Sequence, residues 1–229
     1  IASNPGMELV AICDINEELA AKVPAGVKFY TDYKKMCEEV KPDVVHNLLP
    51  HYLHYPVTKE LVEMGFNVFC EKPIALNTKE AEQFCALEKA HPEVKIGVCL
   101  QNRMNETTEA LKEIIDSGEM GKIRRTNWLI TDWYRPQSYY DSGAWRATWS
   151  GEGGGVLLNQ CPHNLDLWQW ICGMPVKIDA KLKFGKWHDI EVEDDVTAYA
   201  EYANGATGTF ITTTGDAPGT NRFEITCDG

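Results

Sequence analysis

The chain has 229 residues, of which 44% are hydrophobic and 24% are charged, as is typical of a globular protein with one large or two modest domains. Its formal net charge of −12 argues against nucleic acid or an anionic membrane as a partner, because both require basic patches. No signal peptide or long apolar segment is visible, and the eight cysteines form no CxxC pair, so we expect reduced thiols and a cytoplasmic location.

Strand-like and helix-like segments alternate through the first half of the chain. The patterns predict strands within 8–16, 42–50, 67–73 and 94–103, and helices within 32–40, 55–65 and 77–91. This alternation is typical of a parallel sheet covered on both faces, whose ligands gather at the carboxyl ends of the strands. The polar groups "CDIN", "NLLPH", "CEKP" and "LQNR" all lie at such ends.

The pattern changes after residue 120, where long strands follow one another. We expect strands within 122–134, 176–187, 195–215 and 221–229, with the turn "NGATG" dividing the third segment into two strands. Successive long strands indicate an antiparallel sheet in a second domain. The predicted domains are therefore 1–120 and 121–229.

Both ends of the chain look cut. A dinucleotide-binding fold begins with a strand and a glycine-rich turn, and an acidic residue follows about 20 residues later. Here Asp14 ends what would be the second strand, no GxGxxG is present, and the last expected strand stops at "EITCDG". We therefore expect the first strand, the glycine-rich loop and the end of the second domain to lie outside this chain.

Lys72, in "CEKP", follows a predicted strand, and Pro73 favours an extended backbone before it. A lysine in a cleft at a strand end is partly desolvated, which lowers its pKa and lets it exchange protons with a substrate hydroxyl. The alternative is a surface lysine before a turn.

The segment "GGGVLLNQCPHNLDLWQW" (153–170) places glycines before a predicted helix in which Pro162 suits the first turn. If that turn is helical, Asn159 and His163 lie one turn apart and point the same way. They form either a polar site or a simple helix start, with Asn159 as the cap. A zinc site made of His51, His54 and His163 has no recognised ligand spacing, and no neighbour activates Cys161 as a nucleophile, so we predict no metal.

Four signatures occur in order along the chain: "LLPHYLH", "EKPIALNTKEAEQF", "GGGVLLNQCPHNLDLWQWICG" and "EVEDDVTAYAEYANGATGTF". Together they resemble the glucose–fructose oxidoreductase / inositol dehydrogenase / MocA family of NAD(P)-dependent oxidoreductases. The resemblance implies an α/β protein with an N-terminal Rossmann domain and a C-terminal α+β domain built on a large, mostly antiparallel sheet. It also implies an active site between the domains and a homodimer or homotetramer.

The resemblance also implies roles for individual residues. Lys72 and His163 match the family's catalytic groups, and Asp14 sits where an acidic residue binds the adenosine ribose, which favours NAD, with NADP possible. Other matches to cofactor-binding positions are Leu49, Pro50, His54, Glu71, Lys72 and Asn102. Matches to substrate-binding positions are Gln101, Arg103, Trp145, Arg146, Asn159 and His163, the tryptophan stacking on a sugar while the arginine binds hydroxyls.

One position departs from the family pattern, in which an aspartate commonly lies four residues before the histidine. Asn159 stands here and supplies no charge, so we expect it to bind a substrate hydroxyl while His163 and Lys72 share the proton transfer. The implied reaction is hydride transfer between a sugar, inositol or related polyol and the nicotinamide. Two alternatives remain: redox-neutral glycoside cleavage with tightly bound NAD, and a non-catalytic protein that binds sugar and cofactor.

Overall fold

A computed structural model describes residues 4–229. Its strands are β1 (Ala11–Cys13), β2 (Lys28–Tyr30), β3 (Val44–Asn47), β4 (Asn67–Cys70), β5 (Ile96–Val98), β6 (Ile123–Ile130), β7 (Lys177–Phe184), β8 (Glu193–Glu201), β9 (Thr207–Thr213) and β10 (Asn221–Cys227). Its α-helices are α1 (Tyr33–Val40), α2 (His54–Glu63), α3 (Thr78–Ala90), α4 (Glu106–Ser117), α5 (Gln137–Tyr140) and α6 (Pro162–Cys172). Three 3-10 helices are η1 (Glu17–Lys22), η2 (His51–Leu53) and η3 (Gln101–Met104).

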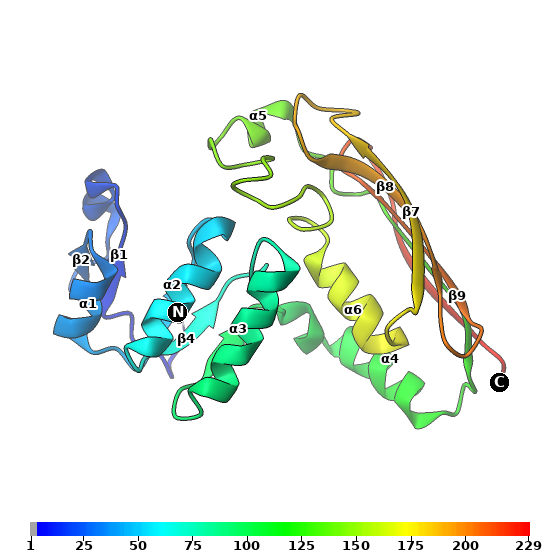
Figure 1. Cartoon of the computed structure of the whole chain (residues 1–229), viewed down its shortest axis with the longest axis horizontal. Coiled ribbons are helices and arrows are strands. Elements are labelled where there is room, and N and C mark those ends of the chain that lie inside the picture. Colours follow the sequence, from blue (N-terminus) through cyan, green and yellow to red (C-terminus); the bar gives the residue numbers. More distant parts are fainter. Residues whose placement is uncertain (1–3) are drawn as a thin grey trace.

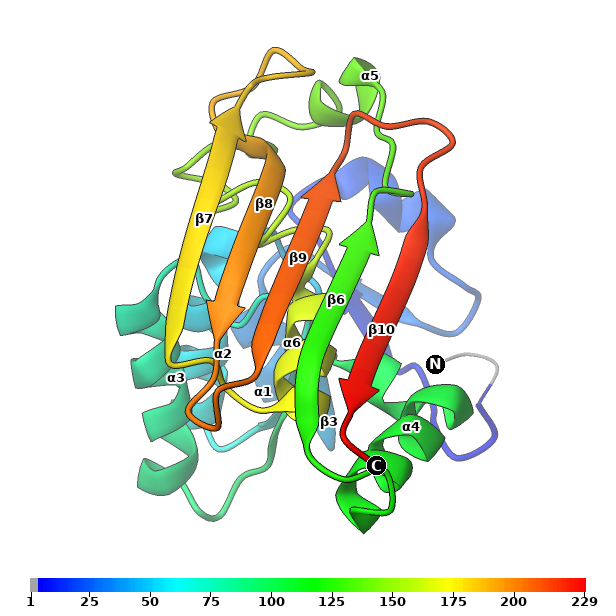
Figure 2. The same cartoon turned by 90° about the vertical axis from the view of Figure 1, so that its right-hand side faces the viewer.

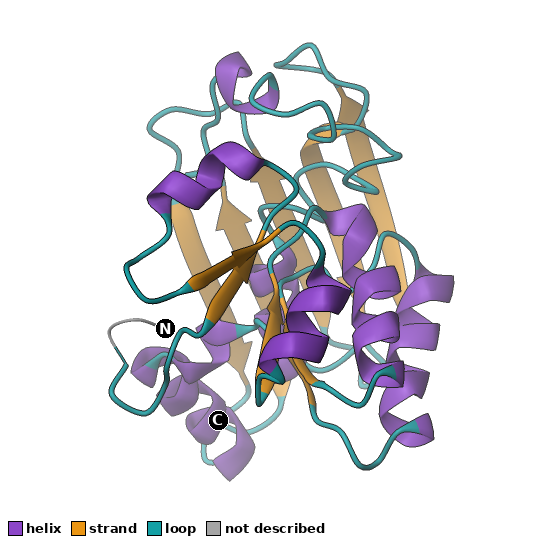
Figure 3. Cartoon of the chain, turned by 90° about the vertical axis from the view of Figure 1, so that its left-hand side faces the viewer, coloured by secondary structure: helices purple, strands orange, loops and turns teal. Residues whose placement is uncertain are grey.

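The first half of the chain confirms the predicted parallel, helix-covered arrangement. β3, β4 and β5 form one parallel sheet, and β1 pairs in parallel with β2 in a second. The predicted sheet is thus divided in two, and a groove of about 450 Å³, lined by Ala11 and Val45, lies between β1 and β3. Figure 3 views the molecule from the side of these parallel strands.

Short-range signals fix the ends of the helices in this half. The Asp32 carboxylate accepts the N–H of Lys34 at 2.8 Å and caps α1, as Asn77 caps α3 by accepting the N–H of Glu80 at 3.0 Å. Gly65 follows α2 with φ of 87°, the left-handed region in which glycine ends a helix at no steric cost.

The second half forms one five-stranded sheet in the order β10-β6-β9-β8-β7. Its pairings are antiparallel except β6–β9, which is parallel, so the sheet is mixed but mostly antiparallel, as predicted. Helices α6 and α4 cover one face (Figure 1), and within residues 4–229 no helix covers the other (Figure 2). The core lies under α6, where Trp168 stacks on Phe210 with ring centroids 5.5 Å apart.

Elements that were not predicted from the sequence include η1, β2, η3, α4 and α5. The strand expected within 94–103 is shorter than predicted, because the chain turns into η3 at Gln101. Across the described part of the chain, no helix has both the length and the apolar character needed to cross a membrane.

Candidate active site

Lys72 lies two residues after β4, at the edge of the sheet where β3, β4 and β5 all end, since these strands are parallel. Its Nζ donates a hydrogen bond to the backbone carbonyl oxygen of Asn159 at 2.6 Å. Burial lowers the pKa of Lys72, and the carboxylates of Glu71 and Glu152 oppose that shift. Lys72 is therefore a half-buried amine in contact with the second half of the chain, and not a free surface lysine.

The glycine run before Asn159 allows a close approach to β8. A Cβ on Gly155 would lie 1.9 Å from the backbone oxygen of Glu193, so only glycine fits there. The buried Glu193 carboxylate accepts the N–H groups of Gly155 at 2.9 Å and Leu157 at 3.1 Å. These contacts hold the segment that carries Asn159 against the sheet.

His163 lies in the first turn of α6, and Pro162 begins that helix as predicted. The interpretation of Asn159 as the helix cap is wrong, because Cys161 is the capping residue and makes no side-chain capping bond. His163 Nε2 lies 3.5 Å from the side-chain nitrogen of Gln101. The other ring nitrogen of His163, Nδ1, is buried and has no partner within residues 4–229.

The electrostatic surroundings of His163 link it to Lys72. Burial and the positive charge of Lys72 lower the pKa of His163, while Glu71 and Asp166 act in the opposite direction. The neutral imidazole is thus favoured beside the amine. The structure brings Lys72, Asn159 and His163 together from opposite halves of the chain.

Glu152 and Tyr139 complete this group, and sequence reasoning missed both. The Glu152 carboxylate is buried and accepts hydrogen bonds from the Asn159 side-chain amide and, at 2.8 Å, from the N–H of Ala147. The Tyr139 hydroxyl lies 3.3 Å from the same Asn159 amide nitrogen. The available signal was the glutamate directly before the glycine run.

Two buried histidines tie the loops of the site together. His54 is 1% exposed, and its ring nitrogens each lie 2.6 Å from a carbonyl oxygen, that of Leu49 after β3 and that of Pro73 after β4. His51 Nδ1 lies 3.3 Å from the backbone oxygen of Glu152. The side chain of His54 therefore contacts protein on both sides, and its predicted binding of cofactor stays a prediction, as do those of Leu49 and Pro50.

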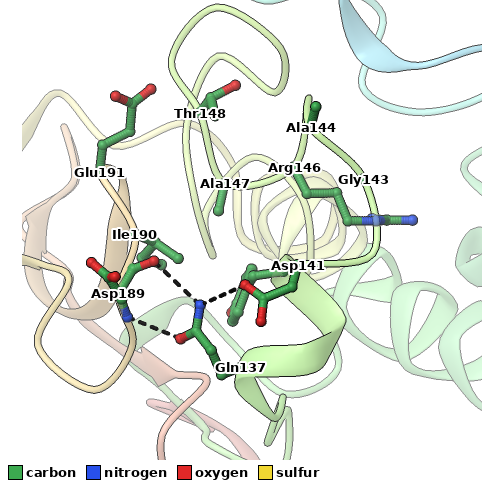
Figure 4. A pocket seen from close by; sticks show the side chains of 11 residues that line it. Gln137, Asp141, Gly143, Ala144, Arg146, Ala147, Thr148, Asp189, Ile190 and Glu191 are labelled. Carbon is green, nitrogen blue, oxygen red and sulfur yellow. Dashed lines mark hydrogen bonds between the residues drawn. The ribbon is translucent and has the colours of Figure 1, made fainter.

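Trp145 and Arg146 lie beside Glu152. The Arg146 guanidinium stands 4.7 Å from the ring centroids of both Tyr139 and Trp145, and its NH1 lies 3.8 Å from the Glu152 carboxylate. Figure 4 shows the adjoining pocket of about 610 Å³, in which Gln137 joins α5 to the 189–191 segment. Its lining includes the acidic residues Asp141, Asp189 and Glu191 together with Arg146.

The remaining predicted site residues have different surroundings. Asp14 follows β1 in the other small sheet, where its Oδ1 accepts the N–H of Asn16 at 2.8 Å. Gln101, Asn102 and Arg103 form η3, and the Arg103 guanidinium makes a two-point ion pair with Asp166 of α6, with Nε–Oδ2 at 2.8 Å and NH2–Oδ1 at 2.5 Å. Arg103 thus links the two halves of the chain.

The Cys161 thiol is not placed to act as a nucleophile. Burial raises the pKa of Cys161 to about 12, which disfavours the reactive thiolate. Among residues 4–229, no group of three or more His, Cys, Asp or Glu side chains could hold a metal ion.

Comparison with known families covers nearly the whole chain. Residues 1–98 match the oxidoreductase family with an NAD-binding Rossmann fold, and residues 108–229 match the GFO/IDH/MocA C-terminal domain. D-glucoside 3-dehydrogenase of Escherichia coli strain K12 is 29% identical over 220 residues, covering 87% of this chain. Inositol 2-dehydrogenase of Salmonella typhimurium strain LT2 is 29% identical over 147 residues, covering 60% of this chain.

A solved structure shares the fold closely. The WlbA dehydrogenase of Bordetella pertussis, in complex with NADH and UDP-GlcNAcA, is 29% identical, with a TM-score of 0.89 over 96% of this chain and 69% of that one. The present chain spans 60% of the length of the glucoside dehydrogenase and 44% of the inositol dehydrogenase. By its sequence and its fold, the chain belongs to the GFO/IDH/MocA family of oxidoreductases.

Proposed function

We propose that the protein containing this chain is an NAD-dependent dehydrogenase that moves hydride between a sugar or polyol and nicotinamide, with Lys72 and His163 as the acid/base groups. One observation carries the proposal. The Lys72 amine, whose pKa burial lowers, is fixed by the Asn159 carbonyl next to a histidine whose pKa is lowered as well. An amine with a lowered pKa at the carboxyl end of a parallel strand, beside an imidazole at the start of α6, suits proton exchange with an alcohol.

The residues of the chain fit a dinucleotide. Asp14 follows a parallel strand, and its Oδ2 remains for a ribose hydroxyl when Oδ1 accepts the N–H of Asn16. The buried Nδ1 of His163 has no partner within residues 4–229, beside the proposed nicotinamide end. We propose that Leu49, Pro50, Glu71 and Asn102 lie along the cofactor and that His54 acts through the two loops it joins.

In this mechanism NAD, when bound, would supply the hydride acceptor or donor, and residues of the chain move the proton. When an alcohol is oxidised to a carbonyl, Lys72 Nζ takes up the hydroxyl proton. The positive charge gained by Lys72 stabilises developing charge on the oxygen. His163 receives or relays the proton through Nε2, the nitrogen that faces Gln101.

Substrate contacts are proposed from the same group. Trp145 offers an aromatic face, and Arg146, already stacked on Tyr139, offers donors to hydroxyl groups. Asn159 and Gln101 flank the amine and the imidazole. Arg103 is proposed to act through its ion pair with Asp166, which fixes η3 and with it Gln101.

Absorbance at 340 nm tests the proposed reaction. The intact protein would receive NAD or NADP and a panel of inositols, aldoses, anhydrosugars and glycosides. We expect a steady rise with NAD and one class of sugar or polyol. Consumption of a glycoside without any rise would favour redox-neutral cleavage, and binding without turnover would favour the non-catalytic alternative.

Location and assembly remain predictions. We propose a cytoplasmic protein, in keeping with eight cysteines that are all free in the structure. We propose a homodimer or homotetramer that pairs through the sheet face left without helices in residues 4–229 (Figure 2).

A further inference from the structure

Glu152 is a buried carboxylate surrounded by donors. It is 1% exposed, and its Oε2 accepts the N–H of Ala147 at 2.8 Å. Its Oε1 accepts a hydrogen bond from the Asn159 side chain and lies 3.8 Å from Arg146 NH1. A carboxylate withdrawn from water is costly unless it is paired and hydrogen-bonded, and this one has both kinds of partner.

Asn159 connects this carboxylate to the catalytic lysine. Because a carboxylate only accepts, the Asn159 amide nitrogen must face Glu152, and its second hydrogen lies toward Tyr139. Within residues 4–229, the side-chain oxygen Oδ1 is then left for a ligand hydroxyl. The backbone oxygen of the same residue holds Lys72 Nζ at 2.6 Å.

We propose that Glu152 is a positioning residue: it fixes Asn159, and thereby the Lys72 amine, and it supplies the buried negative charge that Asn159 lacks. The inference rests on the proposed acid/base role of Lys72. In that role the charge of Glu152 stabilises the protonated amine, so that Lys72 can take up the substrate proton as the hydride leaves.

The charges around both groups agree with this assignment. Burial raises the pKa of Glu152 above its usual value, and the hydrogen bonds from Ala147 and Asn159 and the charges of Arg146 and Lys72 oppose that shift. His51 and Tyr140 are the other titratable neighbours of Glu152. Around Lys72, the carboxylates of Glu71 and Glu152 and the thiol of Cys99 raise its pKa, whereas burial and Arg146 lower it. His51, Cys161 and His163 are the remaining titratable neighbours of Lys72.

Competitive labelling with acetic anhydride tests the coupling without any substrate. Only the neutral amine reacts with acetic anhydride. Mass spectrometry measures the extent of acetylation of the peptide that contains Lys72 at each pH, and the midpoint of this curve is the pKa of Lys72. In Glu152→Gln we expect this midpoint to fall by about one pH unit, because an opposite charge has been removed. Asp194→Asn is the control, since Asp194 is also fully buried but accepts backbone N–H groups of the 186–188 segment.

Charge exchange within the pair provides a second test. Asn159→Asp adds a carboxylate next to Lys72 and should raise the labelling midpoint. The double variant E152Q/N159D keeps one carboxylate and one amide, with their places exchanged. We expect its Lys72 labelling midpoint to equal that of the wild type. We expect its turnover to be about tenfold or more above that of E152Q. Thermal unfolding of each variant reports separately on stability.

The result that would overturn the proposal is a Lys72 midpoint in E152Q equal to that of the wild type. A midpoint that moves equally in E152Q and Asp194→Asn would overturn it too, since loss of any buried carboxylate would then suffice. The labelling reports on the coupling of Lys72 to Glu152 even if Lys72 is not the acid/base group. Failure of the proposed acid/base role and failure of the proposed coupling are therefore distinguishable.

Discussion

Single residues of the site owe their properties to burial. His51 is a buried imidazole next to Trp145, with ring centroids 5.2 Å apart, and it faces the backbone oxygen of Glu152. Burial is the largest cause that lowers the pKa of His51 to about 4, and the positive charges of Lys72 and Arg146 add to it. The native protein therefore keeps this ring neutral near pH 5, where a histidine of the unfolded chain is already charged.

The stability of the protein should depend on pH through His51. Between a pKa of about 6.5 in the unfolded chain and about 4 in the native state, only the unfolded chain binds the proton. The free energy of unfolding should thus fall on acidification from pH 8 to pH 5, by about 2 kcal/mol from this residue. Urea denaturation at both pH values would measure the fall, and His51→Gln should reduce it by that amount. Equal falls in wild type and variant would contradict the assignment.

The sequence identified Lys72, Asn159 and His163 as candidates because each stands in a distinctive local pattern. It did not identify Glu152 and Tyr139, whose importance comes from contacts with Asn159 that only the folded chain creates. Arg103 was expected at the substrate, but its guanidinium is engaged by Asp166, a partner 63 residues away. Local patterns reveal reactive residue types, whereas their partners depend on tertiary structure.

The helices and strands show the same contrast between local sequence patterns and tertiary contacts. Segments with strong periodicity and clear caps, such as α1 with Asp32 and α3 with Asn77, were predicted from the sequence. The three-residue strand β2 is too short to show a period, and it exists because β1 pairs with it. The missed helix α4 does carry a signal, since Gly118 follows it with φ of 73°.

The glycine run is the element on which the site depends most. A Cβ on Gly155 would meet the backbone of Glu193, which cannot move away without breaking β8. Gly155→Ala should lower the free energy of unfolding by about 2 kcal/mol or more, as overpacking does. Thermal denaturation measures the loss, with Gly6→Ala as the control, because a Cβ there meets only the Asn4 side chain at 3.4 Å. Equal stability of the two variants would contradict this packing.

At the scale of the whole molecule, the site joins the parallel strands to the mixed sheet. Lys72 follows β4 in the first part, whereas Asn159 precedes α6 and His163 lies in α6, in the second part; Figure 1 shows both elements. The Arg103–Asp166 ion pair also joins the two parts, because Arg103 lies in η3 and Asp166 lies in α6. Sequence periodicity predicts each part separately, but it contains no information on how the parts face each other.

The ion pair should therefore contribute to stability more than an ordinary surface pair. Two-point arginine–carboxylate contacts are among the stronger ones, so we expect a coupling of about 1 kcal/mol in a double-mutant cycle of Arg103→Gln and Asp166→Asn. Urea denaturation of the four proteins measures it. The exposed pair Lys59–Glu63 serves as the control and should give about 0.3–0.5 kcal/mol. A coupling at Arg103–Asp166 no larger than the control value would contradict the proposed link.

The central claim is that Lys72 exchanges the substrate proton, and Lys72→Ala tests it most directly. With the substrate identified at 340 nm, we expect turnover to fall by roughly two to four powers of ten, since that is the contribution of a positioned acid/base group. Lys79→Ala, which changes an exposed lysine, should behave as wild type. Near-normal turnover in Lys72→Ala would contradict the account.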